Sequence, residues 1–389
     1  MAGPAIPFAI AVYGAKRVQQ VFSDVAAMFA FAALWAGIDL ASSFSKAGGA
    51  VATPAAAEVG APFLMQSASL VGFVGVTFLL GFFAAGIALT IRSRQPLPAA
   101  LAVAVFVANL VFGLVRMATP PQGTIHTAII DSNDVAGARM KADKVKTYKT
   151  IDAFTAEIEK LRGKNVKLIV MPENTAMLAP EWRNEAEAKL GSAAKDVGAT
   201  LVAGFNTYLD GAQRNVSLGY ADGATTPVTY QKRRLVQGLE TLHYTPGNAR
   251  AALPNGVALE ICKDMDFHTM VRDDEVALHP ALMAVPAWDF VTDDWSHGRV
   301  SIMRSVENGV PLARSARDGF MSLNDRYGRI VAIQRSIGPI TTLIGDLPLD
   351  GRGGNTIYDK IGDIFGWLCL VLGAAVAVLA IVRRRQPSP

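Results

Sequence analysis

The stretch GVALEICKDMDF, residues 256–267, places a cysteine at the end of a short apolar run and two aspartates just behind it. The run from Val257 to Ile261 has the length and composition of a strand in a protein core. Cys262, which follows the run, is open to two interpretations. It is either a small buried hydrophobic residue or a nucleophile presented at the end of a strand.

Two further apolar runs also end on reactive side chains. Glu173 ends LIVMPE, residues 168–173, and Lys232 ends VTYQK, residues 228–232. The carboxyl ends of core strands converge on one rim of a layered α/β domain, where binding sites are usually built. Each residue alone has an ordinary structural explanation, but three different reactive types at three such ends predict a common site.

The surrounding residues, about 124–350, alternate short strands with amphipathic helices. In 148–162, Ile151, Phe154 and Ile158 recur at helical spacing, and a second helix is predicted to end at Gly198. The stretch 310–336 is predicted to form a hairpin that turns at DRYG. For Arg314 and Arg317, solvated charge is favoured over substrate binding, although one of them could pair with a carboxylate of the site. This pattern predicts an α/β layered domain with a single core.

The ends of the chain are strongly apolar, and the whole sequence of 389 residues is 51% hydrophobic. Runs long enough to span a bilayer, about 20 residues, lie at 25–44, 70–91, 97–115 and 364–382. Basic clusters precede the first run, separate the second from the third and follow the fourth, so the positive-inside rule places all of them in the cytoplasm. We therefore expect a membrane region with three helices at 1–117, an extracytoplasmic domain at 118–355, and a C-terminal helix with a basic tail at 356–389.

Composition also limits the partners. The basic residues that make up the net charge of +4 are scattered or flank apolar runs, which argues against a nucleic-acid surface. A disulfide framework is not expected, because one of the two cysteines, Cys369, lies inside an apolar run. We expect no cofactor and no metal, because the histidines show no ligand spacing near the predicted site; they are His126, His243, His268, His279 and His297.

The three reactive groups suit acyl transfer. A thiol is only slightly ionised at neutral pH and needs an activator. Glu173 could accept the proton of Cys262 and return it to a leaving group, while the Lys232 ammonium stabilises the thiolate and the oxyanion of a tetrahedral intermediate. The resulting thioester can pass its acyl group to water or to an amine.

At these residues the chain resembles the nitrilase, or carbon–nitrogen hydrolase, superfamily. LIVMPEN, YQKRRLV and LEICKD match its three motifs in order, and the resemblance extends over about 124–350. It implies an α-β-β-α sandwich inserted here between transmembrane helices. It also implies that Glu173 is the general base, Lys232 the oxyanion stabiliser and Cys262 the nucleophile.

Within the superfamily the chain is most similar to the apolipoprotein N-acyltransferase family, because its domain lies between membrane segments and Glu240 follows Lys232 by eight residues. This resemblance implies a bacterial inner-membrane enzyme with a periplasmic catalytic domain. It would transfer an acyl chain from a phospholipid to a lipoprotein amine, with Glu240 in a supporting role. Apart from the resemblance, we expect a supporting role for Asp264, which lies two residues after the cysteine. The chain departs from the family in having four predicted spans where about eight are usual. Lys263 and Asp264 also follow the cysteine where the family tends to have Tyr-Glu.

Other interpretations stay open at the sequence level. The chain also resembles conjugal-transfer proteins of the TraB type in its arrangement as a short membrane protein. That resemblance would make the amine acceptor a transfer-apparatus protein. A membrane-anchored amidase or nitrilase-type hydrolase, or a component of a conjugation or secretion apparatus with a vestigial hydrolase fold, would fit as well. Trp288 and Trp295, which flank DFVTDD, are either walls of a substrate pocket or packing residues at the base of a loop.

Overall fold

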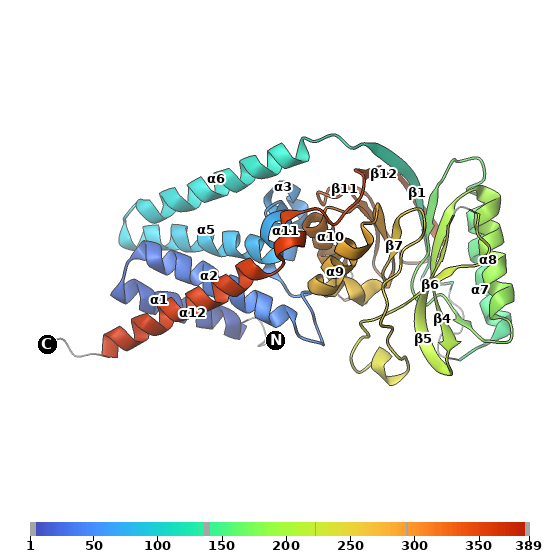
Figure 1. The fold of residues 1–389 in the computed structure, drawn as a ribbon, viewed down its shortest axis with the longest axis horizontal. Coiled ribbons are helices and arrows are strands. Elements are labelled where there is room, and N and C mark those ends of the chain that lie inside the picture. Colours follow the sequence, from blue (N-terminus) through green and yellow to red (C-terminus); the bar gives the residue numbers. More distant parts are fainter. Residues whose placement is uncertain (1–4, 136–140, 222, 293–294, 386–389) are drawn as a thin grey trace. The chain divides into compact units, whose positions relative to one another are not determined.

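The computed structural model describes residues 5–135, 141–221, 223–292 and 295–385, shown as a ribbon in Figure 1. The chain forms two compact units. One contains the residues up to 120 together with those from 356 onward, and the other contains residues 121–355.

The first unit is helical. Four of its helices are long and apolar enough to cross a membrane: α2 (Asp24–Ser43), α5 (Phe73–Ser93), α6 (Leu97–Met117) and α12 (Ile364–Arg385). Each coincides with one of the four apolar runs of the sequence. The unit also contains α1 (Ala5–Val21), η1 (Pro54–Gly60), α3 (Pro62–Met65), α4 (Ala68–Val71) and α11 (Ile357–Ile361).

Small residues let these helices pack closely. A Cβ atom on Gly37 of α2 would lie 2.5 Å from the backbone of Leu370 in α12, so this crossing requires glycine.

The Asp39 carboxylate, also on α2, accepts hydrogen bonds from the hydroxyls of Thr53, at 2.8 Å, and Thr77, at 2.6 Å. These hydroxyls offset the cost of placing a carboxylate among apolar helices.

The second unit contains two β-sheets. The first sheet has the order β12-β1-β2-β4-β5-β6, with β3 paired to β4, and the second has the order β11-β10-β9-β8-β7. The strands of the first sheet are β1 (Gly123–Asp131), β2 (Leu168–Val170), β3 (Met177–Leu178), β4 (Thr200–Leu209), β5 (Ala212–Tyr220), β6 (Val228–Gln231) and β12 (Thr341–Leu349). Those of the second are β7 (Val257–Leu259), β8 (Leu282–Trp288), β9 (Leu312–Arg317), β10 (Phe320–Asn324) and β11 (Ile330–Arg335).

Helices cover the outer face of each sheet. They are α7 (Lys144–Glu159) and α8 (Arg183–Val197) on the first sheet, and α9 (His268–Leu278) and α10 (Ser296–Asn308) on the second, with the one-turn helices η2 (Glu240–Leu242) and η3 (Cys262–Asp266) in loops (Figure 1). This arrangement confirms the predicted α-β-β-α sandwich.

The alternation of side chains along the strands builds two cores. In β1, Ile129 points toward the second sheet, whereas Ala128 and Ile130 pack against the helices. Leu168 and Val170 of β2 likewise face the second sheet. Because successive side chains of a strand point to opposite faces, these apolar runs bury both of their faces.

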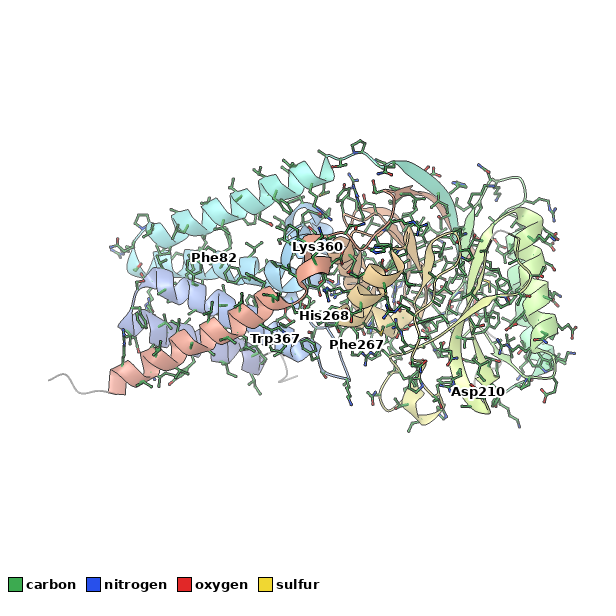
Figure 2. The ribbon with its side chains drawn as sticks, in the orientation of Figure 1. Phe82, Asp210, Phe267, His268, Lys360 and Trp367 are labelled. Atoms are coloured by element: carbon green, nitrogen blue, oxygen red, sulfur yellow. The ribbon has the colours of Figure 1, made fainter. Side chains whose placement is uncertain are left out.

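The C-terminal strands differ from the sequence prediction. Residues 310–336 form three strands rather than one hairpin. The second turn, near DRYG, is present as predicted, but an earlier tight turn at Asp318 and Gly319 separates β9 from β10. Asp318 adopts a φ of +58°, a conformation that Asp tolerates better than most residues. Asp210, with a φ of +51°, makes a similar tight turn at the tip of the β4–β5 hairpin (Figure 2).

Candidate active site

Glu173 lies in the loop after β2, three residues beyond the strand end at Val170. Its N–H donates to the Ala287 carbonyl at 3.3 Å, which ties the loop to β8 of the second sheet. A Cβ atom on Gly204 of β4 would lie 2.6 Å from the Glu173 Cα and from the Pro172 oxygen. Glycine at position 204 therefore allows the Glu173 loop to lie directly on β4.

Lys232 and Cys262 also follow strands. Lys232 comes directly after β6, and its N–H donates to the Asn215 carbonyl of β5 at 2.9 Å. Cys262 opens η3, three residues after β7 ends at Leu259, with a φ of +42°. Non-glycine residues rarely adopt this left-handed conformation, and strain of this kind clusters at functional sites.

A buried group of charges surrounds Lys232. Its Nζ donates to Glu173 Oε1 at 2.7 Å and to Glu240 Oε2 at 2.8 Å. The Asn215 amide also donates to both carboxylates, to Glu173 Oε1 at 2.6 Å and to Glu240 Oε1 at 2.8 Å. All four side chains are almost fully buried. The structure thus brings Glu173, Lys232 and Glu240 into direct contact.

Burial and charge set the protonation of this group. Burial raises the pKa of Glu173, although Lys232 opposes the shift. Burial would also raise the pKa of Glu240, but the Lys232 ammonium and the Val236 N–H, at 2.8 Å, lower it overall. Burial alone would lower the pKa of Lys232, but the two carboxylates raise it well above its ordinary value. Glu173 is therefore the member that exchanges a proton most readily.

Cys262 lies beside this group in the same cavity. Burial, with the negative charge of Glu173, raises the pKa of its thiol well above the ordinary value, while Lys232 opposes the shift. The Sγ donates to the Trp288 carbonyl at 3.5 Å. The thiol is therefore protonated at neutral pH, and its activation requires proton transfer to a base.

The cavity has a volume of about 360 Å³. One part of its lining is polar or charged and comprises Glu173, Asn174, Lys232, Glu240, His243, Cys262, Lys263 and His297. The other part is apolar or aromatic and comprises Val236, Leu239, Tyr244, Trp288 and Phe290. The cavity therefore combines a thiol, a carboxyl group and an ammonium with walls that suit an apolar group.

Asp264 joins the two segments that carry the lysine and the cysteine. Its Oδ1 accepts the N–H groups of Arg234, at 2.7 Å, and Arg233, at 3.2 Å, directly after Lys232. Its Oδ2 accepts the Ile261 N–H at 3.3 Å, directly before Cys262. Burial raises the pKa of Asp264 to about 6, against the effect of Lys232.

The two tryptophans occupy different environments. Trp288 lines the cavity, and its Nε1 donates to Asp318 at 2.8 Å. Trp295 packs edge-to-face on Phe320, with ring centroids 5.3 Å apart. The pocket-wall interpretation therefore suits Trp288, and the packing interpretation suits Trp295.

The arginines of β9 correct the sequence interpretation. Arg314 and Arg317 were expected to be solvated, but both are almost completely buried. Arg314 makes a two-pronged ion pair with Asp289, at 2.6 and 2.8 Å, and Arg317 donates to the Ser132 and Asn174 carbonyls. Arginine can be buried in this way because its planar guanidinium satisfies several acceptors at once.

Asn215 is the site residue that sequence reasoning missed. In β5, Asn215, Ser217 and Gly219 alternate with Val216, Leu218 and Tyr220, and the three apolar residues pack under the helices. Such a pattern is typical of a strand with a solvent face. Here the polar face is buried within the sandwich, so Asn215 meets the two carboxylates.

Among the described residues, no cluster of three or more His, Cys, Asp or Glu side chains is arranged to hold a metal ion. No protein-family model matches this chain. Apolipoprotein N-acyltransferase of Geobacter metallireducens is 23% identical, in a match that covers 97% of this chain and 78% of that protein. The enzyme of the same name from Bradyrhizobium diazoefficiens is 26% identical, over 83% of this chain and 68% of its own length.

The chain is homologous to the apolipoprotein N-acyltransferases. This relationship confirms the predicted resemblance to that family, which was based on the membrane segments around the domain and on Glu240, and the predicted N-acyltransferase-like class of enzyme. Among solved structures, an amidase of the nitrilase superfamily from Nesterenkonia is 18% identical with a TM-score of 0.48, covering 59% of this chain and 93% of that one. The likeness to the N-acyltransferases extends beyond the sandwich, since the Geobacter match includes the helical unit as well.

Proposed function

We propose that this protein is a membrane-bound thiol acyltransferase. It moves an acyl chain from a phospholipid, through a thioester on Cys262, to an amine of a lipoprotein. The observation that carries this proposal is the single cavity in which Cys262, Glu173 and Lys232 meet an apolar wall. The name of the homologous proteins, apolipoprotein N-acyltransferase, supports the choice of acceptor, and the apolar wall of the cavity supports a lipid donor.

In the first half of the reaction, Cys262 attacks the ester carbonyl of the donor. The S–H proton passes to Glu173 as the S–C bond forms, because the thiol is protonated at rest. When the C–O bond breaks, Glu173 returns the proton to the leaving oxygen. The products are an acyl thioester on Cys262 and a lysophospholipid.

Lys232 and Glu240 contribute electrostatic stabilisation and transfer no proton. Lys232 keeps its positive charge between the two carboxylates and stabilises the oxyanion of the tetrahedral intermediate. Glu240, which also accepts the Val236 N–H, stays ionised and holds Lys232 in place. This division leaves Glu173 free to act as the base.

In the second half, an amine attacks the thioester. The N–C bond forms, the C–S bond breaks and the amine loses a proton through Glu173, so that an amide is released and the Cys262 thiol is restored. The carboxylate, the ammonium and the thiol therefore return to their starting states after each cycle.

A lipid donor suits the rim of the cavity. Leu239 and Phe290, which line it, are 48% and 43% exposed, and Leu242 in the same loop as Leu239 is 70% exposed. Exposed apolar groups around an active site favour substrates that arrive from a lipid surface. We place the protein in the bacterial inner membrane with several spans, residues 1–117 and 356–389 in the membrane region and residues 118–355 outside the cytoplasm.

Labelling of the enzyme tests this function. Membranes that contain the protein are incubated with a phospholipid labelled in its acyl chain, and the protein is then separated and treated with hydroxylamine. We expect a label that hydroxylamine removes, that is absent from Cys262→Ala, and that persists in Cys369→Ala, the matched control for the other cysteine.

An unlabelled wild-type protein would contradict the acyltransferase. Release of ammonia from short-chain amides by the same unlabelled protein, dependent on Cys262, would instead establish an amidase.

A further inference from the structure

The catalytic cavity contains a second charged group, on residues that the proposed mechanism does not use. Lys263 and His297 both line the cavity, and both contact Asp266, which is completely buried. His297 Nδ1 lies 3.0 Å from Asp266 Oδ1, and Lys263 Nζ lies 3.6 Å from Asp266 Oδ2. Three residues from η3 and α10 thus form a fixed group, since Asp266 orients both basic side chains.

The group favours positive charge in the cavity. Burial would lower the pKa of His297, but the Asp266 carboxylate beside it raises the pKa above its ordinary value. With His297 protonated, both basic side chains carry a positive charge at the wall of the cavity. The contact with Asp266 uses the ring nitrogen Nδ1.

A phospholipid donor needs such a group. Its phosphate carries a permanent negative charge, and the cavity already contains the carboxylates of Glu173 and Glu240. Like charges in a poorly solvated site repel strongly. Lys263 directly follows Cys262 along the chain, and both residues line the same cavity.

We propose that Lys263 and His297 form an anion-binding subsite for the phosphate of the acyl donor, and this inference rests on the proposed function. The subsite holds the head group while the acyl ester lies at Cys262. It also selects donors that carry a phosphate over neutral glycerides with the same acyl chains.

A donor comparison tests the subsite. Thioester formation on Cys262 is measured in detergent micelles with labelled phosphatidylethanolamine and with a diacylglycerol of identical chains. We expect the wild type to prefer the phospholipid. A charge-assisted hydrogen bond contributes about 1.5–3 kcal/mol, so Lys263→Met should lower kcat/KM for the phospholipid about 10- to 100-fold, mainly through KM. The rate with diacylglycerol should fall much less than the rate with the phospholipid, because this donor carries no phosphate, and His297→Gln should act in the same direction.

Control variants separate charge from structure. Lys263→Arg keeps the positive charge and should retain the preference for the phospholipid. Lys164→Met, at an exposed loop position, removes a lysine elsewhere and should change neither rate. Equal losses with both donors in Lys263→Met, or no loss with either, would overturn the subsite while leaving the acyltransferase intact.

A second measurement is independent of the donor. Cys262 is alkylated with iodoacetate, an anion, and with iodoacetamide, its neutral counterpart, and the ratio of the two rates cancels changes in thiol reactivity. We expect Lys263→Met to lower this ratio about tenfold and Lys263→Arg to preserve it. If wild-type protein forms no thioester from either lipid, the proposed function fails, and the ratio still shows whether the subsite exists. An unchanged ratio in Lys263→Met would refute the subsite.

Discussion

Glu173 and Glu240 are the same residue type in the same buried group, yet their surroundings give them different protonation. Both contact Lys232 and Asn215, but Glu240 also accepts a backbone N–H from Val236. The additional donor and the ammonium keep Glu240 ionised, while burial raises the pKa of Glu173. One backbone hydrogen bond therefore helps to keep Glu240 ionised, while Glu173 can act as a base.

A buried carboxyl group outside the catalytic group predicts how stability depends on pH. Asp131 is fully buried at the end of β1, where Ser315 Oγ and the Ser132 N–H donate to it, both at 2.7 Å. Burial raises its pKa from 3.8 to about 7, against the effect of Arg317. The folded protein therefore binds this proton more tightly than the unfolded chain, and stability falls as the pH rises from about 4 to about 7.

Asp131→Asn removes this titration. The difference in the free energy of unfolding, variant minus wild type, should increase by up to about 4 kcal/mol between pH 4 and pH 8. Chemical unfolding of both proteins in the same detergent at each pH measures the difference, and other carboxyl groups cancel in the comparison. A difference that stays constant with pH would contradict the prediction.

The sequence predicted that Glu173, Lys232 and Cys262 lie in one place, but it did not predict all of the residues around them. Glu173, Lys232 and Cys262 stand out because each follows an apolar run. Asn215 does not, because a polar residue that alternates with apolar ones in a strand normally faces water. Arg314 was misjudged for a related reason: its partner, Asp289, is distant in sequence, and no local pattern reveals such a pair.

At the scale of the elements, most strands and helices follow from apolar periodicity, whereas the turns follow from less visible features. Helix α8 ends at Gly198, as expected, because this glycine adopts the left-handed conformation that ends helices. The Asp318–Gly319 turn carries a sequence signal that the prediction did not use, because an Asp-Gly pair is typical of tight hairpin turns. The residues around it, LARSARDGFMSLN, show no clear apolar alternation that would mark two strands.

The contact between β4 and the Glu173 loop yields a prediction about one element. Gly204→Ala would place a methyl group 2.6 Å from the Glu173 Cα and from the Pro172 carbonyl, so the loop must move. We expect a loss of about 1–3 kcal/mol in the free energy of unfolding. Thioester formation should fall at least tenfold, because small displacements of a catalytic group are costly.

Gly123→Ala is the matched control, because a Cβ atom at Gly123 meets nothing within 4 Å. Thermal unfolding and the labelling assay on both variants provide the measurement. If Gly204→Ala behaves like Gly123→Ala, the close approach of β4 does not position Glu173.

For the whole molecule, the basic clusters beside the apolar helices predict the orientation of the chain. Single cysteines at Lys164, on the catalytic unit, and at Gln95, between α5 and α6, report on the two sides; both positions are exposed. They are introduced after Cys262 and Cys369 are replaced by alanine. In spheroplasts, a membrane-impermeant maleimide should label Lys164→Cys at once and Gln95→Cys only after lysis.

The opposite pattern would place the catalytic unit in the cytoplasm. Labelling of both positions before lysis would place residue 95, between α5 and α6, on the same side of the membrane as residue 164, which contradicts the predicted topology.

The pairing of β1 with β12 has a consequence for biosynthesis. β1 is the first strand of the catalytic unit and β12 the last, and they pair antiparallel from Gly123 with Leu349 to Asp131 with Thr341. A ribosome must therefore make nearly the whole unit before this side of β1 finds its partner. Until then the strand exposes an unpaired edge that can associate with other chains. Chaperone protection is needed most during that interval, and slow synthesis of the last strands would prolong it.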